Sequence, residues 1–377
     1  MRVGVMTFLH NDNYGSTLQA WALQRTLADL GCDAEHIDYR PSREEKLRNL
    51  ILSGNSPRLV VEGLRKRSVK AARPGAREKA ASFDAFYREH MRLSPPCADH
   101  AALRKTAKQY DLLLCGSDQI WSPVWLNPAY FLDFAAPGQP RLAYAPSLGV
   151  SRMPKGRKAR RMARLMAGFS ALSVREAEGA ALLHAITGKD VPVLPDPVLL
   201  MERAQWLALA ETPPADTNPY LLCYFIGESP AYWENARQTA EARGLDIRVL
   251  PVTEVSYQQS LPLADGASPA QWLGWLAGAA AVCTDSFHGA AFATLLHKPL
   301  YLQRRYREED PESKNSRIDQ LLRTCYGDMR PEDADWEKVD QRLSQERTMA
   351  IRWLKEAVTA ALPAQGAGAI QAAATPR

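Results

Sequence analysis

The architecture is set by residues 2–39, whose sequence is RVGVMTFLHNDNYGSTLQAWALQRTLADLGCDAEHIDY. The β-rich run at residues 2–9 predicts a buried strand, and the polar stretch at residues 10–15 predicts a loop after it. Ser16 and Gln19 have the spacing of a helix capping box, so a helix is expected to begin there and to end at Gly31.

Residues 32–39 predict a second strand, and the succession of strand, helix and strand indicates a parallel sheet. The same alternation continues, with strands expected at residues 110–115, 141–145, 171–174, 191–194, 220–226, 247–250, 280–284 and 300–302. Helices are expected at residues 155–168, 176–186 and 269–277, and two more are expected, one that ends at residue 243 and one that begins at residue 289. This pattern predicts an α/β protein with two doubly wound, Rossmann-like lobes.

A Pro-rich linker, ETPPADTNP at residues 211–219, interrupts the alternation. The expected domains are an N-terminal lobe at 1–200, a C-terminal lobe at 201–362 ending in a long helix, and a disordered tail at 363–377. Ligands of such sheets bind beyond the carboxyl ends of the strands. The polar loops at residues 10–16, 116–122 and 284–289 are therefore expected to face a common cleft.

Composition excludes several classes of protein. Of 377 residues, 46% are hydrophobic and 24% charged, and 22 Gly, 26 Pro and six Cys are too few for a fibrous, disordered or disulfide-rich chain. The scattered cysteines predict reduced core thiols. No run of about 18 uncharged apolar residues is present, and we expect a cytoplasmic protein.

Two segments are strongly basic. Residues 43–81 carry eleven Lys and Arg among aliphatic residues, which predicts a basic, amphipathic helical insertion, and residues 152–164 carry seven. Either segment could be a solvated helix face or could contact the inner face of an anionic membrane. Nucleic acid is not expected as a partner, because no recognition motif accompanies the charge.

Familiar catalytic motifs are absent: the sequence has no GxGxxG after the first strand, no GxxxxGK[ST], no GxSxG and no HExxH. The histidines are scattered and no metal-ligand cluster is visible, so neither a metal nor another cofactor is expected. Different residues must carry the chemistry.

The segment TDSFHG at residues 284–289 places His288 at a strand-to-helix junction. Its imidazole suits proton transfer, the helix start favours an anion, and Gly289 would let a ligand approach the backbone. The alternative is a histidine satisfied by Asp285. Arg175, in SVRE at the end of a predicted strand, could hold a carboxylate or phosphate with its planar guanidinium, or could form an ion pair with Glu176.

Two further segments give weaker indications. GSDQIW at residues 116–121 includes Trp121, which could stack on a sugar, although tryptophan is more often a core residue. Lys314 and Arg317 lie near the start of a predicted helix, against the usual preference of the helix dipole, and could bind an anion there.

Six motifs in one order carry a resemblance: the segment YGSTLQAWALQ from Tyr14, then GSDQIW, SVRE, LPDPVLL from residue 194, TDSFHG and NSRI from residue 315. Together they span about residues 1–325, and the chain resembles the polysaccharide pyruvyltransferase family. The resemblance implies a fold like that of B-type glycosyltransferases. It also implies transfer of pyruvate from phosphoenolpyruvate to hydroxyls of a cell-surface glycan or its lipid-linked precursor, as a ketal.

The family's histidine maps to His288 and its strand-end arginine to Arg175. Many members have Arg-Leu-His where this chain has Ser286-Phe287-His288, so Lys314 or Arg317 would have to replace the missing arginine. The full set of expected site residues is His288 and Asp118 for catalysis, Arg175, Ser286, Gly289, Lys314 and Arg317 for the donor, and Asp12, Asn13, Tyr14 and Trp121 for the acceptor.

Two other functions stay open at this point. The same fold could carry a glycosyltransferase that uses a nucleotide sugar, because fold does not determine function. A non-catalytic glycan-binding or lipid-binding protein would also be compatible with loss of the arginine, although the presence of both His288 and Arg175 argues against it.

Overall fold

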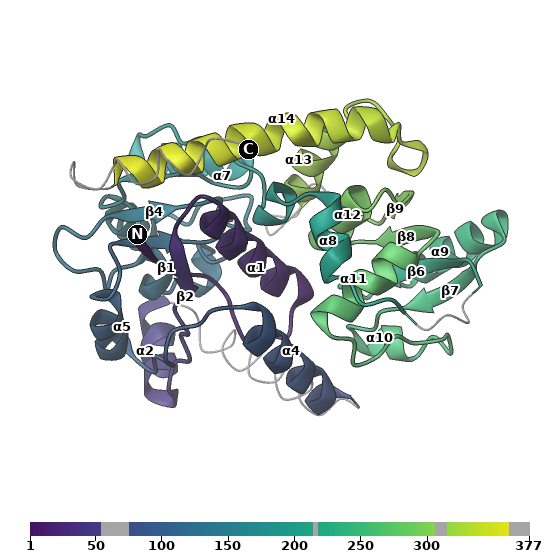
Figure 1. Ribbon diagram of the computed structural model, residues 1–377, viewed down its shortest axis with the longest axis horizontal. Helices are drawn as coiled ribbons and strands as arrows, with labels where there is room; N and C mark the ends of the chain where they lie inside the picture. Colours follow the sequence, from purple (N-terminus) through teal and green to yellow (C-terminus); the bar gives the residue numbers. More distant parts are fainter. Residues whose placement is uncertain (54–74, 214–217, 306–314, 362–377) are drawn as a thin grey trace. The chain divides into compact units, whose positions relative to one another are not determined.

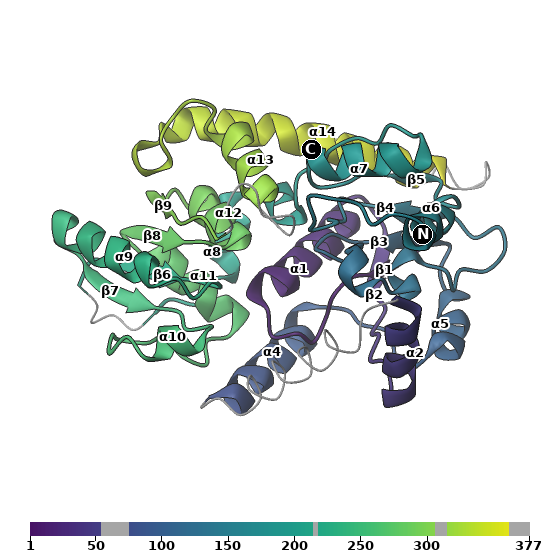
Figure 2. The ribbon, with the colours of Figure 1, turned by 180° about the vertical axis from the view of Figure 1, so that it is seen from behind.

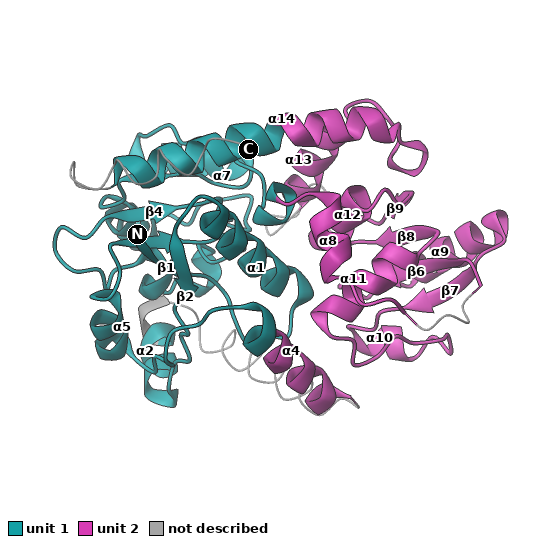
Figure 3. Cartoon of the chain, viewed as in Figure 1, with its two compact units in different colours: residues 1–72, 87–200, 346–377 teal, residues 73–86, 201–345 magenta. Residues whose placement is uncertain are grey.

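The computed structural model describes residues 1–53, 75–213, 218–305 and 315–361 (Figure 1). It divides into two compact units (Figure 3): unit 1 comprises residues 1–72, 87–200 and 346–377, and unit 2 comprises 73–86 and 201–345. The change of unit after residue 200 falls where the lobes were expected to meet in sequence. The prediction was wrong for residues 73–86, which belong to unit 2, and for the end of the final helix, which belongs to unit 1.

Unit 1 is built on a five-stranded parallel sheet with the order β2-β1-β3-β4-β5. Its elements are β1 (Arg2–Met6), α1 (Tyr14–Asp29), β2 (Asp33–His36), α2 (Arg43–Ser53), α5 (His100–Ala107), β3 (Leu112–Cys115), β4 (Arg141–Ala143), α6 (Arg157–Met166), β5 (Ala171–Leu172) and α7 (Ala177–Thr187), with short 3-10 turns η1 (Pro123–Trp125), η2 (Pro128–Phe131) and η3 (Pro197–Leu200). Figure 2 shows the strands from behind, with β3 beside β1 and β4.

Successive side chains of each strand point to opposite faces of this sheet, and helices cover both faces. On one face Leu112 and Leu114 pack with α1 and with the final helix, α14 (Trp336–Ala360). On the other face Leu113 and Cys115 pack with α5, α6 and α7. The central strand β3 is therefore apolar on both sides, as expected inside a doubly wound parallel sheet.

Unit 2 has a four-stranded parallel sheet with the order β7-β6-β8-β9. Its elements are α8 (Arg203–Leu209), β6 (Tyr220–Tyr224), α9 (Pro230–Arg243), β7 (Asp246–Val249), α10 (Glu254–Tyr257), α11 (Pro269–Gly278), β8 (Ala281–Thr284), α12 (Phe287–Leu295), β9 (Leu300–Leu302), α13 (Asn315–Cys325) and η4 (Pro331–Asp333). Helix α9 packs on one face through Trp233 and Ala236, while Trp272 of α11 contacts both Tyr224 and Phe292.

Helices α4 (Ala76–His90) and α14 each contribute to both units, as the colours of Figure 3 show. The last part of α14 belongs to unit 1 because Ala350, Leu354 and Val358 are buried in the core of that unit. Amphipathic packing of this face, and not the order of elements in the chain, therefore decides to which unit the helix end belongs.

Local chemistry accounts for the differences in element boundaries. Helix α1 begins earlier than predicted because Asn13, a stronger N-cap, accepts a hydrogen bond from Ser16 N at 3.1 Å. Gln19 does not close a capping box with Ser16, since its amide donates instead to Thr7 Oγ1 at 3.0 Å. Gly31 follows the helix with φ of 79°, as expected of a C′ glycine.

Other predicted strands are shorter or absent. The first strand ends at Met6, and β5 stops at Leu172. Residues 191–194 form no strand and contribute only an isolated bridge between Val174 and Val193. Pro192 and Pro195 flank that bridge, and proline has no N–H to continue a ladder.

The basic segments are partly helical. Of residues 43–81, the structure describes α2 and the start of α4, while residues 54–74, like the predicted tail at 363–377, lie outside the described residues. In the second segment α6 begins at Arg157, and its Met162 and Met166 are buried. All six cysteines are buried and free. No helix in the described part of the chain is long and apolar enough to cross a membrane.

One buried histidine joins three parts of unit 1. His100, at the start of α5, lies with Nδ1 3.1 Å from Glu45 of α2 and Nε2 2.6 Å from Asp133. The hydrogen bond to Asp133 raises the pKa of His100 although burial opposes the charged form, and the charge of Asp133 and the contact with Glu45 add to the rise. The imidazolium thus links α2, α5 and the loop after η2.

We predict that His100→Gln lowers the stability of unit 1 by about 1–3 kcal/mol near pH 6, because the buried Glu45 carboxylate and the Asp133 carboxylate lose their shared donor. Because the folded pKa is raised, this stabilisation is complete below the unfolded value of about 6.5 and is lost as the pH rises through the folded pKa. Denaturant unfolding at several pH values measures the effect. His184→Gln, at an exposed His–Asp pair, is the control. A stability difference that grows with pH would contradict the prediction.

Candidate functional site

Both sheets reverse their strand order at an equivalent point. In unit 1 the reversal lies between β1 and β3, and in unit 2 between β6 and β8. The loops that leave the carboxyl ends of such neighbouring strands run to opposite faces and form the usual ligand site of doubly wound sheets. In this chain they begin after Met6 and Cys115 in unit 1, and after Tyr224 and Thr284 in unit 2.

The two loops of unit 1 are joined by direct hydrogen bonds. Ser16 Oγ donates to the Asp118 carboxylate in a short hydrogen bond, and Asn11 Nδ2 donates to Ser16 Oγ at 3.2 Å. Thr7 Oγ1 also donates to Ser117 O at 2.9 Å. The structure therefore brings together the predicted loops at residues 10–16 and 116–122, whereas the loop at 284–289 lies in unit 2.

Backbone strain is concentrated in these loops. His10, Asp12 and Asp118 have φ angles of 54°, 48° and 71°, a left-handed conformation that L-residues with a side chain seldom adopt. Each such residue costs on the order of 1–3 kcal/mol and persists only where the surroundings hold it. Strain of this kind is typical of functional loops, and it fixes the direction of both aspartates.

The predicted acceptor residues differ in their environment. Asn13 is exposed, but its side chain caps α1, and Tyr14 is 3% exposed. Trp121 is fully buried, stacks on Phe131 with ring centroids 5.1 Å apart, and donates from Nε1 to Tyr130 O. The prediction that Trp121 stacks on a sugar was wrong, because its ring faces are covered by the core.

Arg175 does not lie at an open edge of the sheet. Its guanidinium is 2% exposed, forms a short ion pair with Asp196, and lies 3.9 Å from Glu176 Oε2. Burial disfavours the charged form, but these two carboxylates outweigh it and raise the pKa of Arg175 above its ordinary value. The alternative of an ion pair with Glu176 is therefore present, and Asp196 is the nearer partner.

The Asp196 carboxylate extends this network to the loop that carries Asp118. Ser117 Oγ donates to Ala145 O at 2.7 Å and lies 3.3 Å from Asp196 Oδ2. Asp118 O accepts from Ser147 N at 2.8 Å. Residues from the GSDQIW, SVRE and LPDPVLL motifs thus form one buried framework, which holds Asp118 in its strained conformation.

In unit 2, Asp285 closes the loop after β6. Its carboxylate accepts from Ile226 N and Gly227 N, both at 2.7 Å, and from Arg305 Nε at 3.0 Å. Arg305 also donates to Asp285 O. Sequence reasoning missed Arg305, although two arginines directly after a strand were a signal that cationic side chains lie at the carboxyl end of the sheet.

Helix α12 begins at Phe287, two residues earlier than predicted, because Ser286 is its N-cap and accepts from Gly289 N at 3.3 Å. A Cβ on Gly289 would lie 2.6 Å from Thr284 Oγ1 and 3.1 Å from the Tyr224 ring. The prediction that Gly289 admits a ligand was wrong, since the protein itself occupies that space. The glycine instead allows close packing of α12 on the sheet.

His288 lies in the first turn of α12 and is 9% exposed. Its ring is 5.1 Å from that of Phe287, and the guanidinium carbon of Arg317, in the first turn of α13, is 6.0 Å from the centre of the Phe287 ring. The structure therefore places both His288 and Arg317 beside the Phe287 ring. Lys314 lies outside the described residues.

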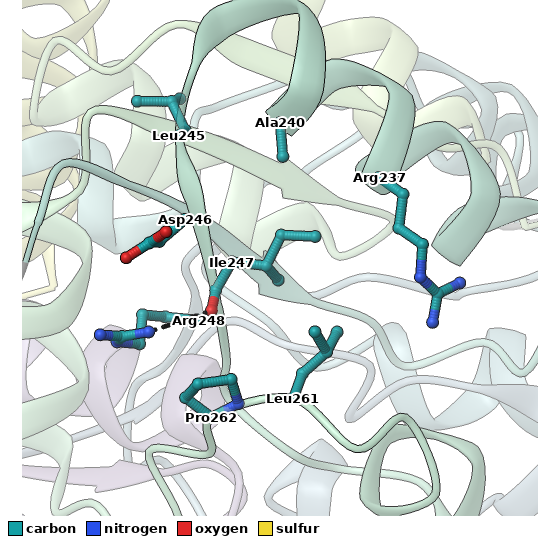
Figure 4. Close-up of a pocket in the computed structure, with 8 residues that line it drawn as sticks. All are labelled: Arg237, Ala240, Leu245, Asp246, Ile247, Arg248, Leu261 and Pro262. Atoms are coloured by element: carbon teal, nitrogen blue, oxygen red, sulfur yellow. Dashed lines mark hydrogen bonds between the residues drawn. The ribbon is translucent and has the colours of Figure 1, made fainter.

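A shallow cavity of about 380 Å³ lies elsewhere in unit 2 (Figure 4), along the edge strand β7. It is lined by Arg237, Ala240, Leu245, Asp246, Ile247, Arg248, Leu261 and Pro262. None of the predicted site residues lines it. Among the described residues no group of three or more His, Cys, Asp or Glu side chains has the arrangement of a metal site.

Comparison with known proteins gives a family and a fold. Residues 13–302 match the family model of polysaccharide pyruvyl transferase. A putative UDP-N-acetylglucosamine 2-epimerase from Listeria monocytogenes is 10% identical with a TM-score of 0.52, and the match covers 95% of this chain and 96% of that one. At this identity the similarity concerns the fold alone, and it confirms two Rossmann-like α/β lobes.

Two other solved structures show weaker similarity. The UDP-GlcNAc 2-epimerase of Neisseria meningitidis, bound to UDP-GlcNAc, is 10% identical with a TM-score of 0.47, over 95% of this chain and 99% of that one. MurG from Acinetobacter baumannii is 11% identical with a TM-score of 0.41, over 98% and 97%. A search of curated proteins found no match.

We predict that Asp196→Asn destabilises unit 1 by about 3–5 kcal/mol, because it leaves the buried charge of Arg175 without its nearest counter-charge. The double variant Arg175→Met, Asp196→Leu should lose less than the sum of Arg175→Met and Asp196→Leu. Chemical denaturation of the four proteins gives the coupling energy. Strictly additive losses would show that the pair is not a structural unit.

Proposed function

The chain belongs to the polysaccharide pyruvyl transferase family, and we propose that it transfers a pyruvyl group from phosphoenolpyruvate to hydroxyls of a cell-surface glycan or its lipid-linked precursor, forming a pyruvate ketal. The observation that supports this most strongly is the arrangement at the start of α12. There, His288 of the motif that matches the family's histidine and Arg317 of α13 both lie beside the Phe287 ring. A proton donor and a cation thus lie together where an anionic donor could bind.

The donor needs anchors for a carboxylate and a phosphate. We assign one anchor to Arg317, which replaces the arginine absent at Ser286, and the other to the amide groups of the first turn of α12. Ser286 and Gly289 contribute by fixing this turn. Arg305 is neutralised by Asp285, so it shapes the loop without adding net positive charge.

Arg175 has a different role in this proposal. Because its charge is already balanced by Asp196 and Glu176 within the core of unit 1, it is a positioning residue and not a donor contact. Through Asp196 and Ser117, Arg175 holds the loop that carries Asp118. We assign Asp118 and Asp12 to the hydroxyls of the acceptor. Both carboxylates can accept hydrogen bonds from a sugar.

Ketal formation requires protonation of the methylene carbon of phosphoenolpyruvate, removal of protons from the acceptor hydroxyls, and stabilisation of an oxocarbenium-like centre. We assign the acid to His288. A cationic side chain and a helix start can neutralise phosphate, so we propose that the reaction needs no metal ion or cofactor.

The reaction is tested by incubating the protein with phosphoenolpyruvate, short or lipid-linked glycans and excess chelator. Release of inorganic phosphate together with the mass of a pyruvyl ketal on an acceptor is expected. In a thermal-shift series phosphoenolpyruvate should raise the melting temperature, because a ligand that binds only the folded state stabilises it. Stabilisation by nucleotide sugars but not by phosphoenolpyruvate would support the glycosyltransferase alternative instead.

We predict that His288→Gln lowers turnover about 100-fold or more, since a positioned acid contributes roughly that factor. Its thermal stability and its shift with phosphoenolpyruvate should remain close to those of the wild type. His184→Gln, on an exposed helix of unit 1, is the matched control and should be fully active. Near wild-type turnover of His288→Gln would remove the residue from the mechanism.

We also propose that the enzyme works in the cytoplasm at the inner face of an anionic membrane, where a lipid-linked acceptor would lie. Leu47 of α2 and Trp125 of η1 are 58% and 53% exposed, and these two elements are in contact. Lys158 of the basic helix α6 donates to Pro123 O at 3.0 Å. One surface of unit 1 therefore combines apolar side chains with the cations of α2 and α6, as interfacial helices do.

We predict that binding to vesicles containing anionic lipid falls steeply between low and physiological salt, because exposed charges are screened over about 8–10 Å there. Trp125→Ala should weaken the binding further, whereas Leu207→Ser, at an exposed leucine of unit 2, should not. Sedimentation with vesicles measures both effects. Salt-independent binding, or none at low salt, would show that these are solvated helix faces.

A further inference from the structure

A histidine and a carboxylate outside the predicted site meet at the carboxyl end of the unit 1 sheet. His10 follows β1 in the loop that carries Asp12, and Asp38 follows β2, the neighbouring strand. His10 Nε2 lies 2.9 Å from Asp38 Oδ1. The imidazole is 19% exposed, while the carboxylate is 3% exposed. A buried acid thus supports a histidine that retains access to solvent.

The surroundings hold this pair in one orientation. The His10 ring contacts the Tyr87 ring with centroids 4.8 Å apart, and Tyr87 OH accepts from His10 N at 3.2 Å. Arg40 Nε donates to both Asp38 oxygens at 2.9 Å. His10 itself has the positive φ described above, so the loop is strained in the conformation that places the imidazole beside Asp38.

This arrangement is chemically that of an oriented general base. When Nε2–H donates to a carboxylate, the neutral ring has its basic lone pair on Nδ1, and the carboxylate stabilises the imidazolium that forms on protonation. Burial alone would raise the pKa of Asp38, but the hydrogen bonds from His10 and Arg40 hold it below its ordinary value. The carboxylate is therefore ionised and able to play this part near neutral pH.

We propose that His10 is a catalytic residue that takes the proton from the attacking hydroxyl of the acceptor, and that Asp38 is its positioning residue. This inference rests on the proposed function and assigns the base for the acceptor hydroxyl to a residue of unit 1. It also gives a reason for the strain beside Asp12, since that loop would place the acceptor hydroxyl at Nδ1 of His10.

The step balances without a further reactant. The hydroxyl oxygen bonds to C2 of phosphoenolpyruvate as its proton passes to His10, and C3 receives a proton to become a methyl group. The bond from C2 to the phosphate oxygen then breaks, and the second hydroxyl adds to C2. Of the two hydroxyl protons, one is accounted for by the methyl group and one by the released phosphate, and no oxidation or reduction takes place.

The test compares substitutions that suit the backbone. Because Asn and Gly tolerate positive φ, His10→Asn and His10→Gly should fold, and both are expected to lower ketal formation about 100-fold or more while retaining the thermal shift with phosphoenolpyruvate. Added imidazole should restore part of the rate of His10→Gly. His184→Asn, at an exposed His–Asp pair, is the matched control and should be unaffected.

Asp38→Asn separates positioning from structure through the balance between kcat and KM. The Asp38 carboxylate fixes the imidazole tautomer with its basic lone pair on Nδ1, so its loss should lower kcat while KM for phosphoenolpyruvate and the thermal shift stay close to those of the wild type. An unchanged kcat would overturn the role of Asp38.

Two results would overturn the role of His10, and they are distinguishable. If the wild type forms a ketal and His10→Asn does so within about twofold, His10 is not the base. If the wild type binds no phosphoenolpyruvate and modifies none of the glycans, the proposed function itself is wrong and this role is lost with it. Imidazole rescue of His10→Gly supports the proposal, because a merely structural defect would not respond to a free base.

Discussion

Parallel pairing of short strands, with β3, β6 and β8 buried along their whole length, is the constraint on which the rest of this structure depends. Each strand must return to the same end of its sheet through a crossover helix, and the chain starts each sheet near its middle and not at an edge. Neighbouring loops after β1 and β3, and after β6 and β8, therefore leave in opposite directions. Polar side chains lie in these loops because the sheets and the helices packed on them form the apolar cores.

Charges at these points are largely balanced inside each unit. Arg175 is paired with Asp196 and Glu176, and Asp285 with Arg305 and two backbone amides. A buried charge without a partner would cost several kcal/mol, so each network must be complete before any ligand arrives. The charged residues that shape the loops thus differ from those proposed to meet a substrate.

The family motifs accordingly contain two kinds of residue. Ser117, Arg175 and Asp196 come from three motifs far apart in sequence, yet they form one framework below Asp118. His288 and Arg317 come from the other lobe, where both lie beside the Phe287 ring at the start of α12. The fold alone would not separate these roles, since an epimerase of 10% identity has a similar fold.

The sequence by itself determined the alternation of strands and helices, the parallel sheets, the change of lobe after residue 200 and the positions of the polar loops, because these follow from hydrophobic periodicity and from local caps such as Gly31. It did not determine which polar residues face inward. Trp121 and Gly289 belong to the packing of the core, and Arg175 to a buried ion pair, because partners distant in sequence, such as Phe131 and Asp196, reach them only after folding. The pairing of His10 with Asp38 likewise exists only where two adjacent parallel strands end side by side.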